Sequence, residues 1–296
     1  MAHSKEILAV GSIAFDTIYT SQGNREKTLG GSSTYFSISA SQYSQVSLIG
    51  IVGNDFKEKE WNLFRENNIN VDSVEICKGS TFSWGGKYNK DYSKRETLFT
   101  NLGVFENFKP KIITRYNNPI LYLGNIQPEL QLDVIKKINN PYLIAADSMN
   151  LWIDLFPNDV INLIKKVNIL FLNEEEAIQL TGLNDLEKIS DMLLLYGPKI
   201  VIIKKGAKGS LLAFKNRKTD ISAVPRTKVI DPTGAGDSFA GGVLGYIAKH
   251  GLENPIDAIV HGTAIASFTV SGFGLEALCK MTDKELNKKR KGINIR

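Results

Sequence analysis

The chain has 296 residues, of which 43% are hydrophobic and 23% are charged, a mix typical of one large globular domain with a substantial core. Its formal net charge of +5 is modest and its Lys and Arg are spread along the chain, which disfavours a nucleic-acid-binding protein. Two cysteines (Cys77 and Cys279), no apolar stretch near the ~20 residues of a membrane span and no signal sequence predict a soluble cytoplasmic protein with free thiols and no membrane partner.

Short apolar runs with the length of strands buried on both faces recur along the chain. They are Ile7–Val10, Val46–Val52, Ile120–Leu123, Tyr142–Ala146, Ile169–Leu172 and Ile200–Ile203. Helix-length segments separate many of them, including Pro128–Ile138, Asn158–Val167 and Asp185–Tyr196. This alternation predicts an α/β fold, a mostly parallel sheet with helices on both faces. Such sheets bind ligands at the carboxyl ends of their strands.

The stretch Thr81–Asn101 departs from this pattern, because polar and aromatic residues alternate around a polar turn. That alternation predicts a β-hairpin. The segment Phe15–Gly23 predicts a further strand. The sequence contains no internal repeat and no low-complexity linker, so we expect these strands to be insertions into a single domain that spans residues 1–296.

The run Asp231–Gly242 carries the clearest chemical signal in the chain. Apolar residues at intervals of four follow its start: Phe239, Val243 and Ile247. They predict a helix, so the run lies at a helix N-terminus, where unpaired N–H groups and the helix dipole favour an anion. Gly234, Ala235 and Gly236 are small enough to let the backbone approach that anion closely.

Asp237 falls in the first turn of the predicted helix. A carboxylate there could be a plain helix cap, but the glycines at 241 and 242 would weaken a helix start that needed only a cap. The run does not match the phosphate-binding loop pattern, and Phe239 stands where a dinucleotide fingerprint needs its third glycine. The residues therefore predict an anion site beside a base, as in a phosphotransferase that acts on a small alcohol.

At these residues the chain resembles the PfkB family, the ribokinase-like sugar and nucleoside kinases. Further segments match that family in the expected order: Leu8–Asp16, Gly30–Tyr35, Val52–Asp55, Leu172–Ala177 and Val201–Gly209. The likeness extends from about Ile7 to Met281. It implies a ribokinase-like fold in which strands near residues 15–30 and 81–101 form a small β-sheet lid over the sugar site. In some members the lid also pairs with a second subunit, so a homodimer is one option.

The resemblance implies a role for each motif around the phosphate. Asp237 would be the base for the acceptor hydroxyl, and Gly234, Ala235 and Gly236 would form the anion hole. The charges of ATP require a divalent cation, normally Mg²⁺, which Asn173 and Glu176 would organise through water. The alternative is that the acidic residues here simply enrich a helix start.

The nucleotide contacts implied by the family are Lys204, Gly206, Gly209 and Thr233. A lysine at a strand end is also often just exposed. Asp231 lies in a loop that binds a monovalent cation in several members. Pro232 departs from the family pattern in that loop, so activation by K⁺ stays open.

The acceptor site implied by the resemblance contains Asp16, whose carboxylate could accept hydrogen bonds from two sugar hydroxyls. Gly30 and Gly31 would let the sugar approach the backbone. Asn125 follows a predicted strand, and Arg95 in the lid could clamp an oxyanion. An Asx-turn at Asp16 and purely structural roles for Asn125 and Arg95 are the alternatives.

The acceptor is the open question, because the segment Gly30–Phe36 lacks the Lys and Asn of the family's usual Gly-Gly-Lys-Gly-Ala-Asn signature. Ala14 also stands where ribokinase has a substrate Asn. Four aromatic residues could form a wall for a nucleobase or could pack in the core: Tyr35, Phe36, Phe82 and Trp84. The leading hypothesis is an ATP-dependent kinase of a small sugar or sugar-like hydroxyl compound. An adenosine-type nucleoside kinase and an inactive binding protein on the same scaffold are the alternatives.

Overall fold

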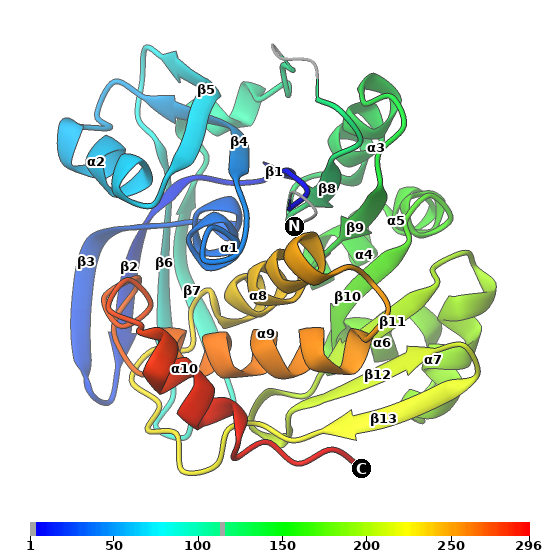
Figure 1. Ribbon diagram of the computed structural model, residues 1–296. Helices are drawn as coiled ribbons and strands as arrows, with labels where there is room; N and C mark the ends of the chain where they lie inside the picture. Colours follow the sequence, from blue (N-terminus) through cyan, green and yellow to red (C-terminus); the bar gives the residue numbers. More distant parts are fainter. Residues whose placement is uncertain (1–3, 113–115) are drawn as a thin grey trace.

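Figure 1 shows the computed structural model, which describes residues 4–112 and 116–296. A nine-stranded sheet forms the centre of this described part, in the order β13-β12-β11-β10-β9-β8-β1-β4-β5. Its strands are β1 (Ile7–Val10), β4 (Val46–Gly53), β5 (Ile69–Cys77), β8 (Ile120–Leu123), β9 (Leu143–Ala146), β10 (Ile169–Asn173), β11 (Ile200–Lys204), β12 (Ser210–Phe214) and β13 (Arg217–Ile221). The pairs from β11 to β5 are parallel, whereas β12 and β13 are antiparallel. All six apolar runs predicted as strands lie in this sheet, which confirms the predicted α/β architecture.

Two cores cover the two faces of the sheet. In β1, Ile7 and Ala9 belong to one core, and Leu8 and Val10 belong to the other, because side chains alternate along a strand. The first core contains α1 (Ser32–Ala40), α2 (Glu58–Glu66), α8 (Ala235–His250), α9 (Pro255–Thr269) and α10 (Asp283–Arg290). The second contains α3 (Pro128–Lys137), α4 (Asn150–Leu155), α5 (Pro157–Ile164), α6 (Glu174–Thr181) and α7 (Leu186–Leu195). The three predicted helices are confirmed as α3, α5 and α7.

A small four-stranded sheet, which we call the lid, has the order β3-β2-β6-β7. Its strands are β2 (Ala14–Thr20), β3 (Gly23–Gly30), β6 (Phe82–Tyr88) and β7 (Arg95–Asn101). β6 and β7 form an antiparallel hairpin, which confirms the prediction for Thr81–Asn101. β2 pairs with β6 in parallel and with β3 in antiparallel orientation.

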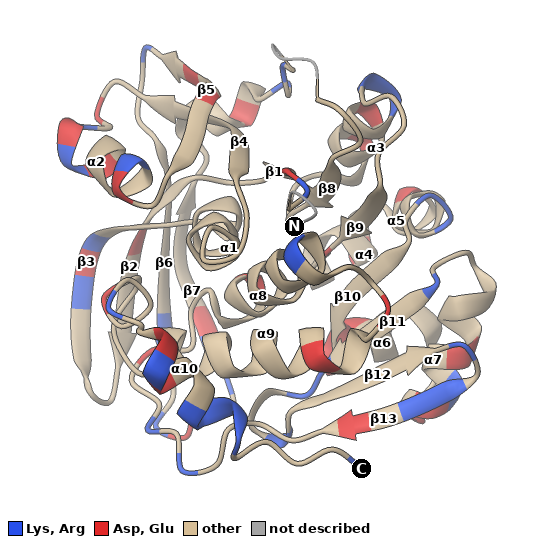
Figure 2. Ribbon diagram, in the orientation of Figure 1, with Lys and Arg blue, Asp and Glu red and all other residues tan. Residues whose placement is uncertain are grey.

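The helices differ in the charge that they carry. Figure 2 shows Lys, Arg, Asp and Glu together on the outer helices α2 and α10, whereas most of α8 and α9 is uncharged. Most residues of α8 and α9 are correspondingly buried. Within the described residues, no helix has the length and apolar character needed to cross a bilayer. Cys77 and Cys279 are both free thiols, as predicted.

The glycines at 241 and 242 have a packing role. A Cβ atom on Gly241 would overlap the backbone of Phe36 in α1, and one on Gly242 would lie 2.9 Å from Cα of Gly262 in α9. Both glycines therefore allow α8 to approach its neighbouring helices closely. This close packing explains both glycines without an anion site. Their presence is therefore no evidence against a simple helix cap at Asp237, contrary to the expectation from the sequence.

Candidate active site

The candidate site lies where the carboxyl ends of the parallel strands meet the N-terminus of α8. Lys204 ends β11, Asn173 ends β10, and the two residues are partners in the register of these strands. Asp147 directly follows β9. Because parallel strands end at one edge of a sheet, residues far apart in the sequence are brought together here.

The first turn of α8 provides N–H groups for an anion. Gly234 precedes the helix with a φ of 73°, in the left-handed region that favours glycine. A Cβ atom at this position would also overlap the ring of Tyr35. The N–H of Ala235 donates to the carbonyl of Pro232 at 3.2 Å, whereas those of Gly236 and Asp237 have no backbone acceptor among the described residues. The N–H of Gly234 likewise has no acceptor among the described residues, so the free donors at the expected anion hole are those of Gly234, Gly236 and Asp237.

Asp237 has the electrostatic character of a general base. Burial, together with the charges of Asp147 and Asp16, raises the pKa of its carboxyl group to about 8, against the opposing effect of Lys204. General bases work best when their pKa lies near the operating pH. A carboxylate at the start of a helix, beside free N–H groups, could accept the proton of a hydroxyl as that hydroxyl attacks a phosphate.

Asp16 lies in β2 of the lid, and its side chain is buried. Burial and the charge of Asp231 raise its pKa to about 7, against the opposing effect of a hydrogen bond from the N–H of Gly31. A Cβ atom on Gly30 would overlap the Asp16 carboxylate, and one on Gly31 would contact the carbonyl of Ser12 at 2.5 Å. Gly30 thus leaves room for the Asp16 carboxylate, while Gly31 lies against the backbone of Ser12 and donates a hydrogen bond to that carboxylate.

Asp231 and Thr233 tie the lid to the loop before α8. The carboxylate of Asp231 accepts hydrogen bonds from the N–H groups of Thr233 at 2.9 Å and Gly274 at 3.0 Å, and burial raises its pKa. The hydroxyl of Thr233 lies 3.1 Å from that of Tyr88, at the end of β6. Tyr92, at the tip of the lid hairpin, donates to the carbonyl of Ile230 at 3.3 Å.

Asn173 and Glu176 form a capping box at the start of α6. The N–H of Glu176 donates to Asn173 Oδ1 at 2.8 Å, and the N–H of Asn173 donates to Glu176 Oε2 at 2.7 Å. This is the helix-start role that was the alternative for these residues. Burial raises the pKa of Glu176 to about 7; the charge of Lys204 opposes this rise, and that of Asp147 adds to it.

The oxygen ligands at this site suit Mg²⁺ only if phosphate and water supply most of its coordination. Among the described residues, no group of three or more His, Cys, Asp or Glu side chains could enclose a metal ion. Mg²⁺, however, commonly keeps several waters and binds through one or two carboxylates together with substrate phosphates. The capping box uses only Oε2 of Glu176, so Oε1 stays available to an ion. These residues therefore fit an ion that is held mainly by phosphate and water.

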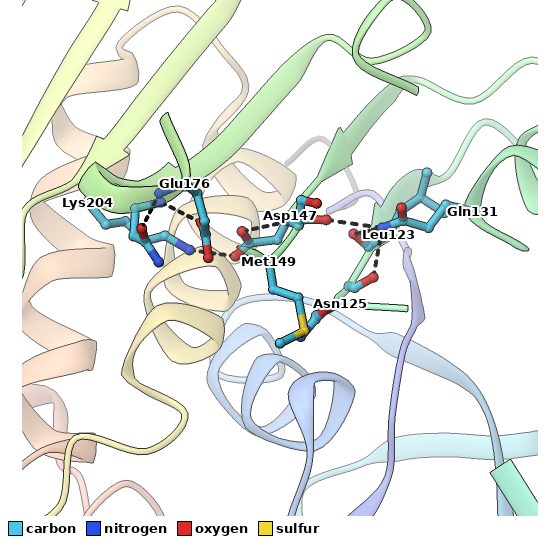
Figure 3. A network of polar contacts seen from close by, with 10 residues as sticks. Leu123, Asn125, Gln131, Asp147, Met149, Glu176 and Lys204 are labelled. Carbon is cyan, nitrogen blue, oxygen red and sulfur yellow. Dashed lines mark hydrogen bonds and ion pairs between the residues drawn. The ribbon is translucent and has the colours of Figure 1, made fainter. Parts of the chain in front are cut away.

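The three residues of the predicted nucleotide strand have different surroundings. Lys204 Nζ lies 2.6 Å from Asp147 Oδ2 (Figure 3). Gly206 has a φ of 57° and open space around its Cα, whereas a Cβ atom on Gly209 would overlap the carbonyl of Ile221. Gly209 is therefore required by the packing of the turn, while Gly206 is open to a ligand.

Two predicted substrate residues bind other side chains. Asn125 Nδ2 lies 3.0 Å from the sulfur of Met149 (Figure 3). Its Oδ1 accepts a hydrogen bond from Trp152 Nε1 at 2.8 Å. These contacts hold Asn125 against α4. Arg95 lies on the exposed strand β7, and its guanidinium is 5.2 Å from the centroid of the Trp84 ring.

The predicted aromatic wall is only half present. Tyr35 and Phe36 are fully buried: Tyr35 lies against Gly234, and Phe36 stacks on Tyr122 with ring centroids 3.7 Å apart. Neither can stack on a base. Phe82 and Trp84 remain partly exposed in the lid. Trp84 is the register partner of Asp16, so the two side chains lie on the same face of the lid.

Asp147 and the hydroxyl of Tyr122 were not among the predicted site groups, and Tyr35 was predicted only as part of the aromatic wall. The hydroxyls of Tyr35 and Tyr122 are buried and have no partner among the described residues. The charges of Asp16, Asp231 and Asp237 act on the Tyr35 hydroxyl, and those of Asp237 and Asp147 act on that of Tyr122. Asp147 could have been found, because it is a carboxylate directly after a buried strand.

Known proteins with similar sequences are kinases. The family model described as pfkB family carbohydrate kinase matches residues 4–282. A cytidine kinase of Thermococcus kodakarensis is 28% identical over 84% of this chain and 91% of its own length, and a nucleoside kinase of Methanocaldococcus jannaschii is 28% identical over 82% of this chain and 79% of its own.

The fold agrees with this likeness. The crystal structure of the Methanocaldococcus jannaschii nucleoside kinase, described as an archaeal member of the ribokinase family, superposes with a TM-score of 0.79. It covers 98% of this chain and 99% of that protein, at 22% identity. The match of the family model over nearly the whole chain and this shared ribokinase-like fold lead to one conclusion: the chain belongs to the PfkB family of carbohydrate and nucleoside kinases, enzymes that transfer a phosphoryl group to a hydroxyl acceptor.

Proposed function

We propose that this chain transfers the γ-phosphate of ATP to a hydroxyl group on the sugar ring of a small molecule, with Asp237 as the base. The observation that carries this proposal is the position of Asp237 in the first turn of α8, beside free N–H groups and with a pKa raised to about 8 by burial. In phosphoryl transfer the protein mainly positions the reactants and stabilises charge, and one group orients or deprotonates the attacking hydroxyl.

The other groups around the phosphates have these roles in the proposal. The N–H groups of Gly234, Gly236 and Asp237 receive the transferring phosphate, and Lys204 and Gly206 contact the nucleotide. Asn173 and Glu176 would hold Mg²⁺ through water. When bound, the ion would neutralise charge on the phosphate oxygens. Asp231 stays a proposed contributor to a K⁺ site, through the loop that its carboxylate braces.

We propose a nucleoside as the acceptor. Asp16 would bind two sugar hydroxyls, and Trp84, its neighbour on the same face of the lid, would contact the base. The cytidine and nucleoside kinases, each 28% identical over 84% and 82% of this chain, support this choice. A free sugar is the second candidate, supported by fructokinases and ribokinases that match 31% to 43% of the chain and by a probable chloroplastic fructokinase of Arabidopsis thaliana that is 23% identical over 90% of it.

The test is ATP consumption with Mg²⁺ across a panel of nucleosides, free sugars and sugar acids. We expect turnover with one or more nucleosides, and Asp237→Asn should lower kcat by about 10²–10⁴-fold while nucleotide binding is kept, the usual span for a general base. Turnover with sugars alone would refute the nucleoside acceptor. If no acceptor stimulated turnover above the Asp237→Asn level, the kinase activity itself would be refuted.

We also propose a homodimer that forms through the lid. β7 lies at an edge of the lid sheet, and all seven of its residues are exposed. Leu98 and Phe99 in this strand are 45% and 37% exposed. An exposed edge strand with apolar side chains is prone to pair with another strand. Light scattering of the purified protein tests the proposal, and a monomeric mass at micromolar concentration would refute it.

A further inference from the structure

A buried ion pair crosses the carboxyl end of the main sheet. Lys204 belongs to the end of β11 and Asp147 follows β9, so the side chains meet across the end of the intervening strand β10. Lys204 Nζ lies 2.6 Å from Asp147 Oδ2, and the two side chains are only 17% and 6% exposed (Figure 3). A lysine at a strand end could extend into solvent, but this one lies along the sheet edge.

The carboxylate of Asp147 is fixed by its surroundings. Its Oδ1 accepts a hydrogen bond from the N–H of Ser148 at 3.0 Å, and its own N–H donates to the carbonyl of Leu123 at 3.0 Å. The amide of Gln131, which is fully buried, donates to the carbonyl of Asp147 at 3.0 Å and to that of Gly124 at 2.8 Å. Asp147 is therefore held on the rigid framework of β8 and β9.

The ammonium group of Lys204 lies against the first turn of α8. A Cβ atom built on Gly236 would be 3.2 Å from Lys204 Nζ, closer than to any other atom of that side chain. Three carboxylates surround this single cation: the charges of Asp147, Glu176 and Asp237 all act on it. Burial alone would lower the pKa of Lys204, but these carboxylates raise it, so the amine stays protonated.

A structural role alone gives this arrangement little benefit. Removing two charges from water costs free energy that their attraction often fails to recover, and an apolar pair of similar volume is frequently as stable. The position beside the free N–H groups of the α8 N-terminus, in contrast, gives the ammonium a clear use, because both features attract the same anion.

We propose that Asp147 is a positioning residue, which holds the Lys204 ammonium beside the N–H of Gly236 so that both bind the phosphates of the nucleotide. This inference rests on the proposed function in taking the triphosphate of ATP as the anion. Lys204 supplies a fixed positive charge at the anion hole, and Asp147 orients it before the nucleotide arrives, which lowers the cost of ordering a flexible side chain.

Calorimetric binding of ATP and ADP tests the proposal without any acceptor. We expect Lys204→Met to weaken ATP binding by about 10- to 100-fold, the range for a charge-assisted hydrogen bond. Asp147→Asn should weaken it by a similar factor, because the amide cannot hold the ammonium in place. In the double variant the loss should equal that of the weaker-binding single variant, since the two residues act as one unit. Lys204→Arg should keep more affinity than Lys204→Met.

The neighbouring pair of Lys205 and Asp220 is a matched control. It has the same residue types, but Asp220 lies on β13 with a side chain that is 55% exposed. Lys205→Met and Asp220→Asn should leave ATP affinity within about twofold. Binding of adenosine, which has no phosphate, should be unchanged in all variants, and thermal unfolding of each variant identifies any loss of fold.

The outcomes separate this inference from the proposed function. Unchanged ATP affinity in folded Lys204→Met or Asp147→Asn protein would overturn the inference, as would additive losses in the double variant. If the coupled loss of ATP affinity appears while no nucleoside or sugar is phosphorylated, the inference stands and the proposed reaction fails. If both single variants phosphorylate an acceptor with undiminished rate and ATP affinity, the proposed function stands and the inference fails.

Discussion

The raised pKa of Asp237 predicts a steep dependence of activity on pH. An aspartate with the ordinary pKa of 3.8 would be ionised throughout the range from pH 6 to pH 9, and the rate would not depend on it. With a pKa of about 8, the carboxylate form, which is the base, is a minor species at pH 6 and the major one at pH 9. The limiting slope below the pKa is tenfold per pH unit, so kcat/KM should rise by roughly 100-fold across this range.

Burial is the main cause of this raised pKa, and three neighbours on different elements modify it: Asp147 after β9, Asp16 in β2 and Lys204 in β11. Removing the charge of Asp147 by Asp147→Asn should therefore move the rising limb to lower pH, because Asp147 raises the pKa of Asp237. Initial rates at constant ionic strength measure the profile, and kcat/KM is the correct quantity since it reports groups of the free enzyme. A profile that is flat from pH 6 to pH 9 in the wild type would refute the assignment of Asp237 as a buried base.

Four further predictions concern stability, the anion hole and the contact between the lid and Thr233. Because the folded-state pKa of Asp237 lies above its ordinary value of 3.8, its contribution to stability is fully present only below that value and is lost progressively as the pH rises to about 8. Asp237→Asn should therefore raise Tm by more at pH 9 than at pH 5, and equal shifts in thermal unfolding at both pH values would contradict this. Gly234→Ala should abolish turnover and lower the free energy of unfolding by about 1–3 kcal/mol, because Gly234 has a positive φ and a Cβ atom there would overlap Tyr35. Gly206→Ala, with a positive φ but open space, should cost only about 1 kcal/mol in denaturant unfolding. Tyr88→Phe removes the hydroxyl that contacts Thr233 and should raise KM with little effect on the fold, as steady-state kinetics and Tm will show.

The strands and the start of α8 could be predicted because their signals are local. Runs such as Ile120–Leu123 are apolar at every position, which is the pattern of a strand covered on both faces. The helix that follows Gly234 shows its apolar residues at intervals of four. The lid hairpin could likewise be read from alternating residues around a polar turn.

The contacts that define the site depend on distant parts of the chain, so the sequence pattern did not contain them. Lys204 looks like any lysine at a strand end until the strand order puts Asp147 within its reach. Asn125 follows a strand in the same way as Asp147, yet Trp152 and Met149 occupy its amide. Position at a strand end thus identified the edge of the sheet that binds ligands, and tertiary packing decided which of its polar residues remain available.

Tyr35 explains why the acceptor is harder to predict than the reaction. Its ring lies against Gly234, while its hydroxyl, which has no partner among the described residues, is acted on by the charges of Asp16, Asp231 and Asp237. In the proposed kinase this one side chain would contact both the phosphate site and the acceptor site. The family signature has a smaller residue, asparagine, at this position. Under the proposed function, Tyr35 would therefore change the shape of the acceptor site relative to the family pattern while the turn at Gly234 stays the same.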